Sequence, residues 1–147
     1  MSFFTNSEQE LIADAIAKAE LTTSGEIRVA LEKHCPNSAM ERAQSYFYKL
    51  GMDKTAEHNG VLVYLAYKDK KFAIVGDKGI NKLVPENFWE MTNVAMKAHF
   101  SSGQIAEGII AGIALIGEQL AIYFPHRSDD INELSNEIVF LDKSTDE

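Results

Sequence analysis

A run of seven apolar residues, VLVYLAY at positions 61–67, constrains the fold more than any other feature of this sequence. A strand that is apolar at every position is buried on both faces, so other elements must cover both sides of its sheet. Residues 71–75, KFAIV, follow a short turn at Asp69 and Lys70 and are predicted to return as an antiparallel partner. The domain is therefore expected to form around a central hairpin.

Helical and strand patterns surround this hairpin. Residues 25–33, GEIRVALEK, alternate in polarity, which predicts a strand with one well-buried face. The first helix has a predicted capping box formed by Ser7 and Glu10. Apolar residues at helical spacing predict four longer helices, over residues 7–20, 38–51, 85–101 and 104–124. These elements predict an α/β fold, a Rossmann-like α/β/α sandwich whose mixed central sheet contains the antiparallel hairpin and has helices on both faces.

The length of 147 residues suits a single domain with one core. We assign residues 1–125 to this domain and residues 126–147 to an acidic C-terminal tail, which is either a docked short element or a flexible extension. In the last helix, Gly108 and Gly112 are expected to allow close packing on the sheet.

Charge and composition argue against several partners and locations. The net charge of −8 disfavours binding to nucleic acid or anionic lipid, because both carry the same sign. The single cysteine, Cys35, cannot form an internal disulfide, and the N-terminus lacks the basic start of a secretory signal. The longest uncharged apolar run, residues 108–117, is about half of the ~20 residues that span a bilayer. We therefore expect a cytoplasmic protein with no membrane span and no nucleic-acid partner.

Strand direction predicts which loops meet. A strand, a crossover helix and a second strand usually form a parallel unit, and the hairpin then returns in the opposite direction. The starts of the first two strands and the end of the third should therefore lie at one edge of the sheet. The segments expected at this edge are residues 24–26, 51–60 and 76–79.

Acidic and amide side chains of these loops are candidate metal ligands, namely Glu26, Asp53, Glu57, Asn59 and Asp77. Carboxylates held together repel one another unless a cation or a proton compensates, and oxygen-rich sites suit Ca²⁺ or Mg²⁺. Asp77 is expected to be central, because it ends a strand and is flanked by glycines that tolerate unusual backbone angles. Lys54 and Lys78 are candidate phosphate contacts beside this site.

Each candidate ligand also has a simpler interpretation. Asp77 belongs to a residue type that is favoured for capping a helix, and a short helical segment follows it. Asp53 and Glu57 are compatible with solvated loop charges, and His58 with a turn residue. Glu26 is compatible with an ion pair to the lysine that follows Asp77.

Three segments resemble the TPM domain family: TSGEIRVAL, AEHNGVLVYLAYKDKKFAIVGDKGINKLVPENFW and FSSGQIAEGIIAGIALIGEQL. The resemblance spans residues 7–124, and its most specific parts are TSGEI at a strand entry, NGVL before the hairpin and VGDKGI at a strand end. It implies an α/β/α sandwich with a divalent-cation site among acidic loops at one rim. It also implies that some members are acid phosphatases, and this chain resembles a short, soluble branch.

Three functions are compatible with these features. The first is a module that binds Ca²⁺ or Mg²⁺ and modulates a protein partner. The second is a metal-dependent acid phosphatase that acts on phosphomonoesters, with the ion as Lewis acid. The third is a protein-interaction scaffold that uses the acidic tail and the last helices without an ion. Whether the chain is an enzyme is left undecided, because it has no P-loop, nucleophile elbow, zinc-protease or dinucleotide-binding motif.

Overall fold

The computed structural model describes residues 3–127 and 133–142. Within this part of the chain, a mixed four-stranded sheet has the order β3-β2-β1-β4. The strands are β1 (Glu26–Glu32), β2 (Gly60–Ala66), β3 (Lys71–Gly76) and β4 (Val139–Phe140). The helices are α1 (Asn6–Glu20), α2 (Ala39–Lys49), α3 (Lys78–Asn81), α4 (Glu90–Ser101) and α5 (Ile105–Tyr123), with a 3₁₀ turn at Met52–Lys54.

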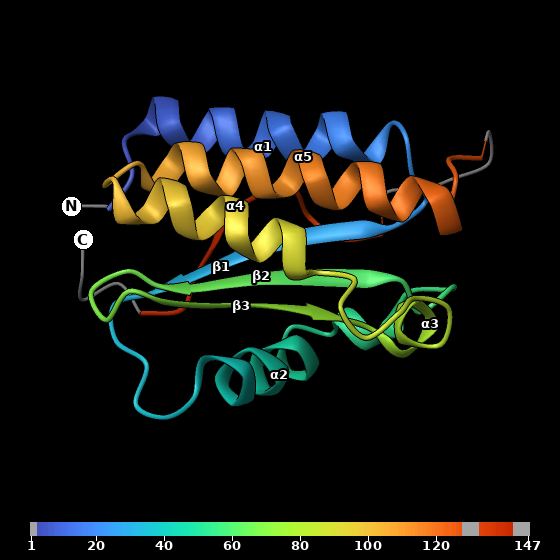
Figure 1. Cartoon of the computed structure of the whole chain (residues 1–147), viewed down its shortest axis with the longest axis horizontal. Coiled ribbons are helices and arrows are strands. Elements are labelled where there is room, and N and C mark those ends of the chain that lie inside the picture. Colours follow the sequence, from blue (N-terminus) through green and yellow to red (C-terminus); the bar gives the residue numbers. More distant parts are fainter. Residues whose placement is uncertain (1–2, 128–132, 143–147) are drawn as a thin grey trace.

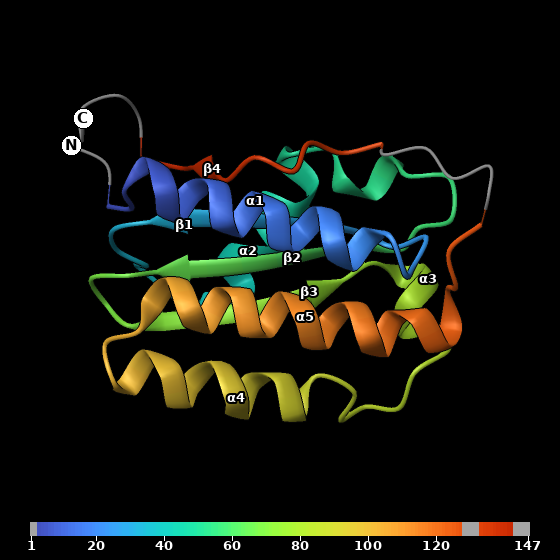
Figure 2. The same ribbon diagram turned by 90° about the horizontal axis from the view of Figure 1, so that it is seen from above.

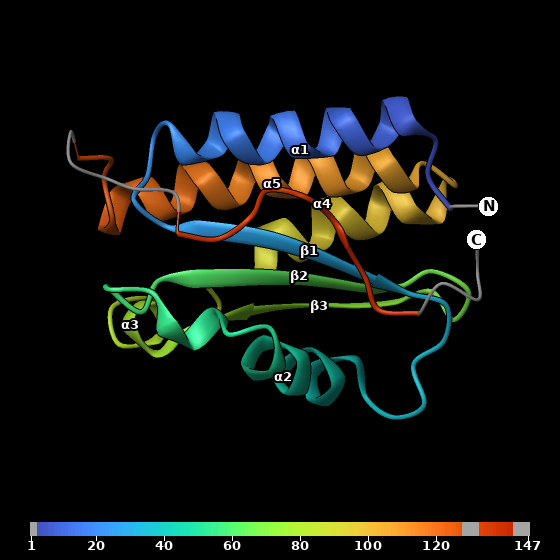
Figure 3. The same ribbon diagram turned by 180° about the vertical axis from the view of Figure 1, so that it is seen from behind.

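Helices cover both faces of the sheet. α1, α4 and α5 form a layer on one face, and α2 lies on the other (Figures 1 and 3). Every residue of β2 is buried. Val61, Val63 and Leu65 belong to the core shared with α1 and α5, whereas Leu62 and Tyr64 belong to clusters on the α2 side. The predicted α/β/α sandwich with a central, doubly buried strand is therefore confirmed.

Strand pairing places the predicted loops at one edge of the sheet. β1 and β2 are parallel, with Glu26 opposite Gly60, whereas β3 is antiparallel to β2, with Gly76 opposite Val61. The starts of β1 and β2 and the end of β3 therefore lie together. We call this edge the rim and define it as residues 24–26, 51–60 and 76–79.

β1 is more buried than its alternating pattern predicts, because Phe47 of α2, Met52 and the C-terminal segment pack in one cluster with Ala30 on its second face. Glu32, at the end of β1, is only 3% exposed. Its carboxylate accepts hydrogen bonds from the Arg42 side chain at 2.7 and 2.8 Å and from the Tyr64 hydroxyl. Burial alone would raise the pKa of Glu32, but these hydrogen bonds and the Arg42 charge outweigh it and lower the pKa. The charged pair therefore links α2 to β1.

The C-terminal segment contributes a strand that the sequence pattern does not predict. β4 pairs in parallel with β1. The Leu141 N–H donates to a β1 carbonyl at 2.8 Å, and the Asp142 carboxylate accepts the Lys33 N–H at 2.6 Å. Of the two alternatives for the tail, docking therefore describes residues 133–142. The tail residues 128–132 and 143–147 lie outside the described residues.

The capping box of α1 differs from the predicted one. The Thr5 hydroxyl accepts the Glu8 N–H at 3.1 Å, and the Glu8 carboxylate accepts the Thr5 N–H at 2.9 Å. The predicted box of Ser7 and Glu10 has the same spacing but is wrong. Phe4, directly before the cap, is buried in the core, so core packing selects between two equivalent local signals.

α4 begins at Glu90, five residues later than the predicted start at residue 85. The preceding segment forms turns, in which the Phe88 N–H donates to the Pro85 carbonyl at 3.1 Å. The Gln119 side-chain amide of α5 donates to the Phe88 carbonyl at 2.7 Å. This side-chain bond takes the place of a helical backbone bond, and it explains why α4 starts after Phe88.

α5 lies between α1 and α4 in the helical layer (Figure 2). Its length and apolar composition alone would allow it to cross a membrane, a property that it shares with core helices of globular domains. A Cβ atom at Gly112 would lie 2.4 Å from the Met96 sulfur of α4, and one at Gly117 would lie 2.8 Å from the Ala19 Cβ of α1. Close packing is therefore confirmed, but the glycines contact neighbouring helices and not the sheet.

The Gly117→Ala substitution is expected to lower the free energy of unfolding by roughly 1–2 kcal/mol. Alanine is the better helix former by about 1 kcal/mol, but overpacking against α1 typically costs about 1–3 kcal/mol. Chemical denaturation measures the difference. In a double-mutant cycle, Gly117→Ala should cost less in an Ala19→Gly background than in the wild type, because Ala19→Gly removes the methyl group that the new Cβ meets. A single Gly117→Ala variant more stable than the wild type would contradict the close contact.

Candidate functional site

Backbone contacts hold the loops of the rim together. The Asn59 carbonyl accepts the Glu26 N–H at 3.3 Å, and the buried Asn59 side chain donates to the Ser24 hydroxyl at 3.3 Å. The Asp77 N–H donates to the Gly60 carbonyl at 2.9 Å. The structure thus brings the predicted residues to one edge, and Asn59 acts there as a link between loops.

Glu26 is directed toward the C-terminal segment. It is 4% exposed, and its two carboxylate oxygens accept the N–H groups of Glu133 and Leu134, each at 3.1 Å. A carboxylate that accepts backbone N–H groups is stabilised in its charged form. The position of Glu26 therefore serves to dock residues 133–142 at the start of β1.

The other charged candidates lie on the surface of the rim. Glu57 forms an ion pair with Arg127 at 2.7 Å. Asp53 is half-buried, whereas Lys54 and Lys78 are exposed. Among the described residues, no group of three or more histidine, cysteine, aspartate or glutamate side chains is arranged to hold a metal ion. The assignment of these residues as metal ligands or phosphate contacts therefore stays a prediction.

Asp77 has one satisfied and one unsatisfied oxygen. Its Oδ1 accepts the Lys78 N–H at 2.8 Å, so Asp77 caps α3 as its residue type predicts. Its Oδ2 is buried and has no hydrogen-bond partner in the described part of the chain. The His58 Nδ1 lies 3.5 Å from this oxygen. Thr55 Oγ1, in the adjoining loop, is likewise buried without a partner among the described residues.

Close approach of two loops explains one of the glycines beside Asp77. The Gly79 N–H donates to the His58 carbonyl at 2.9 Å, and a Cβ at Gly79 would lie 2.4 Å from the carbonyl oxygens of Glu57 and His58. Gly76 and Gly79 do not adopt positive φ, so neither uses the unusual backbone angles that glycine tolerates. The residue with positive φ here is His58, at 51°.

Glu20, at the end of α1 next to the rim, is a half-buried acidic residue that the sequence pattern does not single out. Its carboxylate accepts the Ile27 N–H at 2.9 Å where α1 ends beside the start of β1. Burial raises the pKa of Glu20 to about 7, the Ile27 hydrogen bond opposes this, and the negative charge of Glu26 adds to it. Two carboxylates thus lie close enough to interact, although a glutamate at a helix end carries no sequence signal for this.

The raised pKa of Glu20 makes stability depend on pH. Between about pH 4.5 and 7 the folded protein binds more protons than the unfolded chain, so the free energy of unfolding falls as pH rises. Glu20→Gln cannot ionise, so it removes this fall in the free energy of unfolding, and its side-chain oxygen still accepts the Ile27 N–H. We expect the variant to be more stable than wild type by roughly 1–3 kcal/mol at pH 8, and to match it near pH 4.

Urea denaturation across this pH range, in the presence of a chelator, measures the effect. Glu10→Gln, on the exposed side of the same helix, is the matched control and should follow the wild-type curve. A Glu20→Gln variant that is no more stable than wild type at pH 8 would show that the Glu20 carboxyl is not destabilised by folding.

Comparisons with known proteins agree with this architecture. The NMR structure of BA42 protein from the psychrophilic bacterium Bizionia argentinensis sp. nov. has a TM-score of 0.90 and 47% sequence identity, covering 95% of this chain and 96% of that one. The N-terminal domain of cg2496 protein from Corynebacterium glutamicum shares the fold, with a TM-score of 0.63 and 14% identity over 93% and 80% of the two chains. No curated protein matches the sequence. Residues 1–119 match the TPM domain, and the chain therefore belongs to the TPM domain family.

Proposed function

We propose that this TPM domain binds a divalent cation, Ca²⁺ or Mg²⁺, at the rim around Asp77, and that the bound ion modulates a protein partner. The observation that carries the proposal is the buried Oδ2 of Asp77, which accepts no hydrogen bond from the described residues. A buried carboxylate oxygen without a hydrogen bond is costly unless a cation or proton compensates it. The His58 Nδ1 lies 3.5 Å from this oxygen of Asp77, whereas a divalent ion would contact the oxygen directly.

The residues around Asp77 suit a hard cation that keeps much of its water. Asp77 Oδ2 and Thr55 Oγ1 are buried oxygens without hydrogen-bond partners in the described part of the chain, and oxygen is the ligand type that Ca²⁺ and Mg²⁺ prefer. Asp53 is half-buried in the same loop and would add a second carboxylate. Water would complete the coordination, as is usual for Mg²⁺.

The loop that contains Thr55 also contacts the C-terminal segment, which gives the ion a route to a partner surface. The Ala56 N–H donates to the Glu133 carboxylate at 3.3 Å, and Glu57 pairs with Arg127. An ion that orders this loop would therefore also stabilise the docked segment. A partner that contacts residues 133–142 would then bind differently to the ion-loaded and ion-free forms.

Asp77→Asn is expected to weaken Ca²⁺ or Mg²⁺ binding at least tenfold while the fold is kept. Asparagine caps helices as well as aspartate does, so α3 keeps its N-terminal hydrogen bond while the site loses a charge. Isothermal titration calorimetry of wild type and variant measures the affinity. Asp14→Asn, an exposed position on α1, is the control and should bind as wild type does.

NMR spectroscopy locates the bound ion. Amide shifts on titration should be largest at Thr55, His58 and Asp77, and should extend to Leu134 if the ion stabilises the docked segment. No amide shift at millimolar Ca²⁺ and Mg²⁺, or equal affinity of Asp77→Asn and wild type, would exclude this site.

A metal-dependent acid phosphatase is the second candidate. It is favoured by two exposed lysines, Lys54 and Lys78, at the same rim, where they could bind a phosphate, and by the designation of the family as TPM phosphatases. The protein would then hydrolyse p-nitrophenyl phosphate only with Mg²⁺ or Ca²⁺ present. Asp77→Asn should abolish turnover, and Lys78→Met should raise KM more than it lowers kcat. Turnover that persists in Asp77→Asn would assign the activity to another site or to a contaminant.

A further inference from the structure

The outer edge of β3 has backbone groups that are not used by the sheet. In an antiparallel pair, alternate residues direct both backbone groups toward the partner strand, and the residues between them direct both away. Because the Asp77 N–H donates to the Gly60 carbonyl, Asp77 faces β2, and so do residues 75, 73 and 71 at alternate positions before it. Phe72 and Ile74 therefore direct their N–H and C=O groups away from β2. Within the described residues, these groups have no hydrogen-bond partner.

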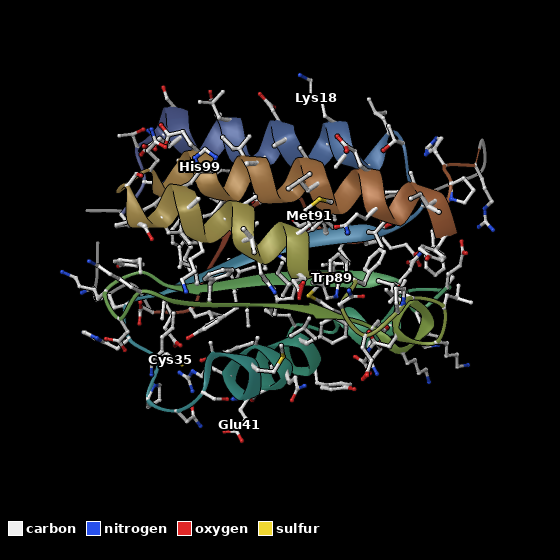
Figure 4. All side chains as sticks on the ribbon, viewed as in Figure 1. Lys18, Cys35, Glu41, Trp89, Met91 and His99 are labelled. Carbon is white, nitrogen blue, oxygen red and sulfur yellow. The ribbon has the colours of Figure 1, made fainter. Side chains whose placement is uncertain are left out.

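A groove of about 590 Å³ runs along this edge. It is lined by Phe72 and Ile74 of β3, by Trp89 at the start of α4 and by Met40 of α2. Figure 2 shows α4 lying beyond β3, and Figure 4 shows Trp89 between α4 and the sheet. The free edge of β3 thus lies in a slot bordered by α4 on one side and by α2 on the other.

The two sides of the slot differ in chemistry. Side chains of a strand added to β3 would point alternately toward α4 and toward α2. On the α2 side they would meet Met40, which is 44% exposed. On the α4 side they would meet Glu86 and Glu90, which are both exposed and, among the described residues, form no ion pair. The Trp89 ring on this side would accommodate the apolar stem of a lysine.

We propose that the β3 edge binds an extended peptide segment of a partner protein, which adds to the sheet as a further strand. Its backbone would pair with Phe72 and Ile74, its basic side chains would face Glu86 and Glu90, and its apolar side chains would face Met40. Strand addition of this kind takes affinity from the main chain and specificity from alternate side chains. The site does not depend on the cation proposed for the rim.

The shape of the edge favours a peptide over a second copy of this chain. Edge-to-edge pairing of two β3 strands about a two-fold axis would put both α4 helices on the same face of the joined sheet. Because α4 already extends beyond β3, the two helices would collide (Figure 2). A single extended segment is narrow enough to enter the slot.

A capped hexapeptide of alternating lysine and valine is the probe for this site. In a titration of the full chain with a chelator present, ¹⁵N NMR shifts should be largest at Phe72, Ile74 and Gly76. Methylating the peptide nitrogens that face β3 should abolish binding, whereas methylating the alternate nitrogens, which face solvent, should leave it within roughly threefold. The chelator makes the result independent of ion binding.

Removing the charges of Glu86 and Glu90 tests whether the basic side chains of the peptide face α4. The double variant Glu86→Gln and Glu90→Gln should weaken peptide binding roughly tenfold, and Glu10→Gln on α1 should leave it unchanged. Equal binding of the two N-methylated peptides, or shifts confined to other elements, would overturn the proposal. Shifts at Phe72 and Ile74 that depend on protein concentration without peptide would also overturn it, because a second copy would then occupy the edge.

Discussion

The burial of β2 on both faces is the constraint on which the rest of the structure depends. An all-apolar strand is stable only at the centre of a sheet that has structure on both sides. α2 and the layer of α1, α4 and α5 provide this cover. The crossover through α2 makes β1 parallel to β2, and the short hairpin turn places β3 on the opposite side. The rim and the free β3 edge are both consequences of this arrangement.

The order and direction of the first three strands could be predicted because they depend on local patterns and on general rules of chain connection. β4 could not. It has only two residues, and the contacts that hold its segment join positions far apart in the sequence, such as Glu26 with the N–H of Leu134. Equivalent local signals also compete, as the two capping boxes at the start of α1 show.

The sequence predicts which residues reach the rim but not where their side chains point. Glu26 and Glu57 are at the expected edge, yet their carboxylates contact Leu134 and Arg127, which belong to the C-terminal part of the chain. A pattern analysis assigns those residues to a tail and therefore cannot identify them as partners. Asp77 shows the converse. Its role as a cap is predictable from residue type, whereas the burial of its second oxygen without a hydrogen bond from the described residues is a property of the packed loops.

The two lateral sides of the sheet, beside β1 and beside β3, differ in whether an extended segment of this chain pairs with them. At the β1 edge, a short segment of the chain itself is held by two pairing positions, together with side-chain bonds at Glu26 and Asp142. So few backbone bonds suffice because charged oxygens anchor both ends of the segment. The outer edge of β3 also combines backbone groups with nearby carboxylates. The N–H and C=O groups of Phe72 and Ile74 have no partner among the described residues, and Glu86 and Glu90 lie alongside them. The segment that we propose for this edge would carry basic side chains opposite Glu86 and Glu90.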